Sequence, residues 1–254
     1  MRRLGILLCG LTLYLIGNAQ TNLPIGKGFN LHVHFVVPYS ESAWPDSAVK
    51  AWIEPRISFA EEIYAYEPAL KLTYEVKRSG QIGGQDLQSL VFRSNKHFHK
   101  FMRKYFPIVA EDSLNGYFPI IIAEKFQVLK PQKRLCGKTF LPSKSLFFGK
   151  RHGMALKRYC ALSVFAHELG HIFKLTHTYK KSFTRKDCNK DFKKGGKGKR
   201  ASANYENRIV NLMDSPIDGF KAVLNDCQKR LAAKERERYL NENNQLNYQL
   251  FKKK

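Results

Sequence analysis

Three histidines and one glutamate in a short segment have the spacing of a catalytic metal site. His167 and His171 are four residues apart, so on a helix both imidazoles stand on one face and can bind the same ion. Glu168 lies next to the first histidine and can reach a metal-bound water without binding the metal. His177 follows six residues after His171, which leaves room for the helix to end and the chain to turn back. The segment therefore predicts a zinc ion held by three imidazoles, with one coordination position open.

The chemistry that this arrangement predicts is hydrolysis by an activated water. Zinc lowers the pKa of a bound water to about 7. Glu168 would act as the general base, taking a proton as the water attacks a carbonyl carbon and passing it to the leaving amine. The alternative is a buried helix with two hydrogen-bonded histidines, in which Glu168 would lack a partner. The third histidine at a defined offset makes a chance match rare.

The segment resembles the metzincin metallopeptidases, whose pattern is H-E-x-x-H-x-x-G-x-x-H followed by a methionine turn. Residues 211–214 (NLMD) are similar to that turn, with Met213 as a hydrophobic support beneath the metal. Cys188 before this turn and Cys227 after it bring the resemblance nearest to the pappalysin and cytophagalysin branch. The resemblance covers about residues 117–239. It implies a zinc metalloendopeptidase with a mixed, mostly parallel five-stranded sheet over the active-site helix, and a C-terminal helix.

Two positions depart from the family pattern. Lys174 stands where the family has a glycine with φ > 0, a conformation that costs a lysine on the order of 1 kcal/mol or more. Either the chain turns differently here, or the surrounding packing compensates for this cost. Ser215 stands two residues after Met213, where relatives often have a tyrosine, which removes one candidate for stabilising the oxyanion. The resemblance also implies that the strand nearest the cleft, placed at residues 138–141, pairs with an extended substrate.

Two rival interpretations stay open. In a different class of zinc peptidase the third ligand is a glutamate from a later helix, and Glu206 is the candidate. In a non-catalytic or weakly active binding protein on the same scaffold, the positive charge would recognise an anionic surface. The intact Glu168 argues against that protein, because a site without catalysis has no use for the base, whereas Lys174 argues for it.

Hydrophobic periodicity predicts the elements that position this segment. Helical spacing occupies residues 46–66, 86–105, 159–175 and 225–240, and strand patterns occupy 29–37, 70–77, 117–123, 138–141 and 145–148. The helix over 159–175 has the clearest apolar stripe, formed by Leu162, Phe165, Ala166, Leu169, Ile172 and Phe173. The order of strands and helices indicates an α/β or α+β domain, with the chemistry on the helix over 159–175.

The N-terminus has the features of a secretory signal. Two arginines precede a short apolar stretch, and small residues follow it, so we expect removal of a signal peptide over residues 1–19. The peptidase domain would then occupy residues 20–240, with a polar and basic tail over 241–254. No later apolar run reaches the length of a membrane span. We therefore expect a secreted or periplasmic protein.

Four cysteines remain after this cleavage, and an even number in an exported chain suggests two disulfides with three possible connectivities. One hypothesis pairs Cys136 with Cys160, which would tie the cleft-side strands to the start of the catalytic helix. It also pairs Cys188 with Cys227, close to the metal site. Buried free thiols are the alternative.

The formal net charge of +23 favours anionic partners. Residues 180–200, from Lys180 to Arg200, hold ten basic side chains against two acidic ones. This stretch can dock an anionic surface, and a solvated insertion is the alternative. No nucleic-acid motif accompanies it. We expect a monomer that acts on a protein or peptide substrate of acidic character, with no specific nucleic acid.

Two further histidines, His32 and His34, alternate on one face of the first predicted strand. The pair resembles half of a second metal site. A packed or solvated strand face is the interpretation that we favour, and we assign the pair no role.

Overall fold

The computed structural model describes residues 28–38, 43–78, 89–92, 94–107, 118–128, 135–140, 153–177, 209–214 and 221–252. Several predictions lie outside the described residues: the signal peptide 1–19, the strand over 145–148, the basic stretch 180–200, Cys188, Glu206 and Ser215. Within the described part of the chain, no helix has the length and apolarity of a membrane span.

A five-stranded sheet forms the centre of the fold, in the order β2-β1-β4-β7-β6. Its strands are β1 (Phe29–Val37), β2 (Leu70–Arg78), β4 (Phe118–Ala123), β7 (Gly153–Lys157) and β6 (Gly137–Phe140). Neighbouring strands are parallel except β6, which runs antiparallel to β7 at the edge. Strand β4 is buried along its whole length, as its continuous apolar run predicts. The mixed, mostly parallel sheet expected from the sequence is confirmed.

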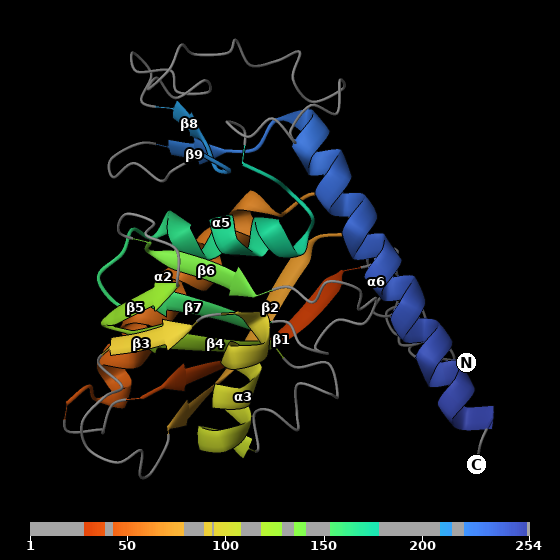
Figure 1. Ribbon diagram of the computed structural model, residues 1–254. Coiled ribbons are helices and arrows are strands. Elements are labelled where there is room, and N and C mark those ends of the chain that lie inside the picture. Colours follow the sequence, from red (N-terminus) through yellow and green to blue (C-terminus); the bar gives the residue numbers. More distant parts are fainter. Residues whose placement is uncertain are drawn as a thin grey trace, which may run out of the picture.

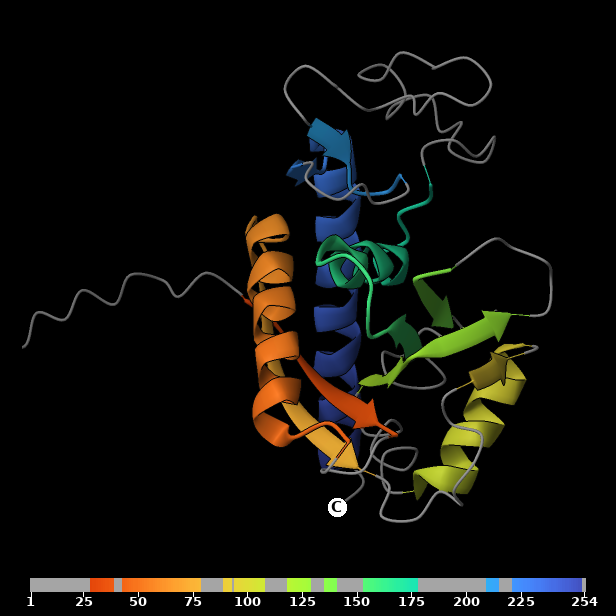
Figure 2. The ribbon, with the colours of Figure 1, turned by 90° about the vertical axis from the view of Figure 1, so that its left-hand side faces the viewer.

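Helices cover both faces of the sheet (Figure 1). On one face, α2 (Asp46–Ile63) and α5 (Ser163–Ile172) share a core with the strands. On the other face, α3 (Asn95–Tyr105) buries Phe98 and Met102 in a smaller core. Figure 2 shows α3 and α5 on opposite sides of the strands. The protein is therefore a three-layer α/β domain.

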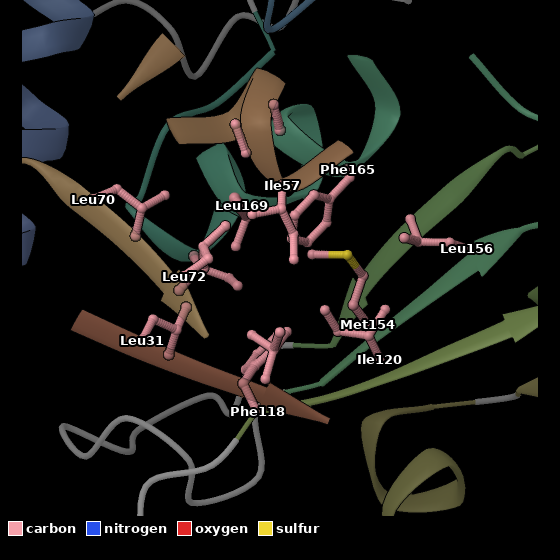
Figure 3. Close-up of a cluster of buried hydrophobic side chains, with 14 of the residues drawn as sticks. Leu31, Ile57, Leu70, Leu72, Phe118, Ile120, Met154, Leu156, Phe165 and Leu169 are labelled. Atoms are coloured by element: carbon pink, nitrogen blue, oxygen red, sulfur yellow. The ribbon is translucent and has the colours of Figure 1, made fainter. Parts of the chain in front are cut away.

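The larger core packs α5 against the sheet (Figure 3). Its labelled members are Leu31, Leu70, Leu72, Phe118, Ile120, Met154 and Leu156 from the strands, Ile57 from α2, and Phe165 and Leu169 from α5. Fully burying one such side chain contributes about 1.5–3 kcal/mol. The apolar stripe of α5 thus fixes which face of the helix points away from the core.

Two small parallel ribbons and a long helix complete the described fold. Strands β3 (Ser89–Phe92) and β5 (Lys125–Val128) pair with each other, as do β8 (Ile209–Asn211) and β9 (Lys221–Val223). Helix α6 (Asp226–Lys252) starts beside β9 and runs down one side of the molecule past β1 and β2 (Figure 1). It continues past the predicted end at residue 240 because neither proline nor glycine interrupts it.

The predicted helix over residues 86–105 is wrong in its first part. Residues 89–92 form β3, and α3 begins only at Asn95. The side chain of Ser94 caps this helix by accepting a hydrogen bond from the backbone N–H of His97 at 3.2 Å. A short apolar run fits a strand or a helix equally well by periodicity, and here pairing with β5 decided the outcome.

Helix α5 is also shorter than its pattern predicts, since it begins at Ser163 rather than at residue 159. The backbone carbonyls of Arg158 and Cys160 accept hydrogen bonds from Trp52 and Arg56 of α2. These carbonyls are satisfied outside the helix, so the chain turns here before the helix starts. Leu162, expected in the buried stripe, consequently lies before the helix and is 38% exposed.

Candidate metal centre

The three histidines singled out from the sequence meet at one end of α5. His167 and His171 lie on the helix, with ring centroids 4.9 Å apart. His177 follows the turn after the helix, and its ring centroid is 5.1 Å from that of His167 and 4.6 Å from that of His171. One ligand atom from each ring lies within 4.8 Å of the others. The three side chains could therefore share one metal ion.

Backbone carbonyls determine which ring nitrogens face this shared position. Nδ1 of His167 donates to the carbonyl oxygen of Leu212 at 2.6 Å, and Nδ1 of His171 donates to that of Leu175 at 2.9 Å. Because a carbonyl oxygen only accepts, both Nδ1 atoms carry a proton, so in the neutral rings the lone pair is on Nε2. These carbonyls are the outer partners that orient metal-binding imidazoles in proteins.

The donor set fits a tetrahedral divalent ion. Nε2 of His167 lies 3.1 Å from Nε2 of His177. Two nitrogens bound to one zinc at about 2.0–2.1 Å would be about 3.3–3.4 Å apart. Burial, the largest influence, lowers the pKa of His171, opposed by the nearby Glu168. The lowered pKa favours the neutral imidazole, which is the form that binds metal.

The turn between the second and third histidines is a helix cap with a left-handed residue. Lys174 has φ of 63°, and it is the one non-glycine residue with positive φ in the described ranges. Its N–H donates to the carbonyl of His171 at 3.1 Å, and the N–H of Leu175 donates to that of Gly170 at 2.9 Å. These two bonds form a Schellman motif, in which the left-handed position favours glycine. A lysine therefore occupies a position of the turn that favours glycine.

Met213 packs against α5 at Gly170, the helix position just before the second histidine. It is fully buried, and a Cβ atom added to Gly170 would lie only 2.5 Å from its Sδ and 2.9 Å from the hydroxyl of Tyr64. Glycine lets the sulfur and the hydroxyl approach the helix backbone directly, and a larger residue would have to displace them. The segment NLMD thus contacts the centre twice, through the side chain of Met213 and the carbonyl of Leu212.

An amide pair anchors this segment to α6. The side chains of Asn211 and Gln228 exchange two hydrogen bonds, at 2.7 and 3.1 Å, and both are buried. The same Asn211 accepts the backbone N–H of Met213 at 2.9 Å. Gln228 was missed in the sequence, because nothing in a charged helix marks one glutamine as the partner of a distant asparagine.

Glu168 is 6% exposed and lies against the edge strand β6. The hydroxyl of Thr139 is 2.6 Å from Oε2 of Glu168 and 2.9 Å from its backbone carbonyl oxygen. A Cβ atom at Gly137 would lie 2.9 Å from Oε1. Gly137 and Thr139 were also missed. The predicted strand began at residue 138, whereas β6 begins at Gly137, so the two-residue period places both side chains on one face only in the structure.

The disulfide between Cys136 and Cys160 confirms the first of the two predicted pairings, with a Cα–Cα distance of 5.6 Å. It ties the start of β6 to the segment before α5, and so holds Thr139 near Glu168. Cys227 is disulfide-bonded as well. Its predicted partner, Cys188, lies outside the described residues.

No protein-family model and no curated protein sequence matches the chain. Among solved structures, it is similar to metalloproteinase-II from Bacteroides fragilis, with 12% sequence identity and a TM-score of 0.38. The match covers 59% of this chain and 44% of that chain, so this chain spans less than half of that protein's length. What the centre can do is therefore inferred from its own distances and contacts.

Proposed function

We propose that the chain is a zinc-dependent endopeptidase of the metzincin type, with the pappalysin and cytophagalysin branch as its nearest group. One observation carries the proposal. Three imidazoles converge with their ligand atoms within 4.8 Å of one another, and a buried glutamate follows the first of them in the same helix. His167, His171 and His177 would hold the ion, and Glu168 would act as the base.

Bound zinc would supply Lewis acidity, which activates water near neutral pH and polarises the carbonyl of the substrate. The chain's own contribution begins with Glu168, which takes the proton from the attacking water and delivers it to the leaving amine. The Thr139 hydroxyl holds Oε2 of this carboxylate, which leaves Oε1 to meet the water. Gly137 keeps the space beside Oε1 open, because any side chain there would collide with it.

Residues around the three histidines would keep these ligands in place. The carbonyls of Leu212 and Leu175 hold two imidazoles by their Nδ1 atoms, and Met213 supports the helix that carries them. Loss of such outer partners typically costs 10- to 100-fold in metal affinity or activity, so about that range is expected for these residues.

The proposed setting is outside the cytoplasm. The signal-like N-terminus and the disulfide both support export to the periplasm or beyond, because such bonds persist in oxidising compartments. The peptidase domain would then occupy residues 20–240. The charge of +23 supports an acidic protein or peptide as the substrate of a monomeric enzyme, with residues 180–200 as a candidate contact for an anionic surface.

The test is hydrolysis of an unfolded protein substrate by the mature chain, together with its zinc content. We expect one zinc bound at the histidines and cleavage that stops on chelation and returns with zinc. Glu168→Gln should abolish cleavage while retaining zinc, and Glu62→Gln on the exposed face of α2 is the matched control.

Two results would contradict the proposal. Zinc-loaded wild-type protein that cleaves nothing would favour the non-catalytic binding protein. Retention of zinc by His177→Ala, together with its loss from Glu206→Ala, would favour a glutamate as the third ligand.

A further inference from the structure

A second group of metal-binding side chains lies on the sheet, apart from the centre at α5. The parallel register of β1 and β2 places His34 opposite Glu75 and His32 opposite Thr73. Residues of β1 at odd positions belong to the core shared with α5, whereas Val36 packs with α3. Because side chains alternate along a strand, His32 and His34 point to the α3 side. The sheet therefore separates this group from the three histidines at α5.

The distances within the group approach those of a metal site. Nε2 of His32 is 3.9 Å from Oε1 of Glu75, and Nδ1 of His34 is 3.8 Å from Oε2. One ligand atom from each residue lies within 4.8 Å of the other two. Donors around a tetrahedral zinc are about 3.3–3.5 Å apart. The side chain of Glu75 is 51% exposed, so its carboxylate has room to move closer to the two rings.

Neighbouring groups orient the three donors and favour the protonation states that bind a cation. Nδ1 of His32 lies 2.8 Å from the hydroxyl of Thr73, which can accept its proton and leave the lone pair on Nε2, toward Glu75. His34 is only 2% exposed, so packing restricts its ring. The hydrogen bond from Lys77 lowers the pKa of Glu75, which favours the ionised carboxylate.

We propose that His32, His34 and Glu75 bind a second divalent metal ion of the zinc class. Two imidazoles and one carboxylate are a donor set that suits zinc and its late first-row neighbours, with a fourth position left for water. The proposal does not depend on the peptidase function. The ligands come from β1 and β2, so the ion would bind the folded sheet and not the unfolded chain. Binding would therefore stabilise the folded protein.

Lys77 places a positive charge beside the ligands of the second site. Its Nζ lies 2.7 Å from Oε2 of Glu75, so a metal ion would bind against a nearby positive charge. The second ion should therefore bind more weakly than the first. Removing that charge should tighten it, which a purely structural role of the two histidines does not predict.

The experiment measures zinc bound per untagged mature chain, by equilibrium dialysis with elemental analysis. We expect two equivalents of unequal affinity in the wild type. His32→Gln and Glu75→Gln should each lose the weaker equivalent, retain the tighter one and keep the wild-type circular dichroism spectrum. Lys77→Met should tighten the weaker equivalent several-fold, whereas Lys71→Met, on the same strand beside Glu61, should leave it unchanged.

Binding of a single equivalent at saturating zinc would overturn the proposal. So would a second equivalent that survives in both His32→Gln and Glu75→Gln. The Glu168→Gln variant, which we expect to be inactive, should still bind two equivalents of zinc, because it retains every proposed ligand at both sites. A failed peptidase assay with two bound equivalents would contradict the proposed function alone, and an active enzyme with one equivalent would contradict the second site alone.

Discussion

The carbonyl oxygen of Leu175 accepts a hydrogen bond from Nδ1 of His171, at 2.9 Å, across the turn that ends α5. The backbone N–H of Leu175 donates to Gly170 in the same turn. One residue thus closes the helix with its N–H and orients a proposed metal ligand with its carbonyl. The stability of this turn and the geometry of the centre are therefore coupled.

Lys174→Gly should stabilise the protein by up to about 1 kcal/mol, because glycine adopts the left-handed conformation without steric cost. Urea unfolding of the metal-loaded chain would measure this change. Lys174→Ala is the control, since it removes the charge and keeps the Cβ atom. Equal stability changes in the two variants would show that the charge, and not the backbone, matters.

Gly170→Ala should destabilise the protein by about 1–3 kcal/mol, because the added methyl group overlaps the sulfur of Met213 and the hydroxyl of Tyr64. Helix propensity alone predicts the opposite sign, a gain of up to about 1 kcal/mol. Chemical denaturation distinguishes the two. Combining the change with Met213→Ala should cost less than the sum of the two single changes, and strict additivity would contradict the contact.

Thr139→Val should lower kcat by about 10- to 100-fold with zinc content unchanged, because Glu168 loses the hydroxyl that positions Oε2. Steady-state kinetics on a peptide substrate would separate kcat from KM. Thr139→Ser keeps the hydroxyl and should retain most of the activity. A change confined to KM would mean that Thr139 serves substrate binding instead.

Replacing both Cys136 and Cys160 by serine should cost about 3 kcal/mol of unfolding free energy, as expected for a closed loop with a sequence separation of 24 residues. Thermal unfolding of the oxidised wild type and the double variant would measure it. Activity should fall as well, because the disulfide holds β6 beside α5. Unchanged stability together with full activity would show that packing alone positions the strand.

Local spacing was sufficient to predict which three histidines meet. Residues four apart on a helix share a face whatever surrounds it, and a following turn can return only a nearby residue. The environment of β4 was also predictable, because its uninterrupted apolar run indicates a strand that is buried on both faces. The sequence left open whether the chain would keep a left-handed turn at Lys174 or turn differently, and the structure shows the left-handed turn.

Contacts between distant segments depended on the tertiary structure. Thr139 reaches Glu168 across 29 residues of sequence, and Asn211 reaches Gln228 through the packing of α6. The apolar run at residues 89–92 became a strand only because β5 lies beside it. Likewise, the register of β1 and β2 brings Glu75 to His34. Hydrophobic periodicity shows which residues of one element face the core. Which two elements pair, and in which register, depends on how the side chains of the whole core pack together. No local sequence pattern contains that information.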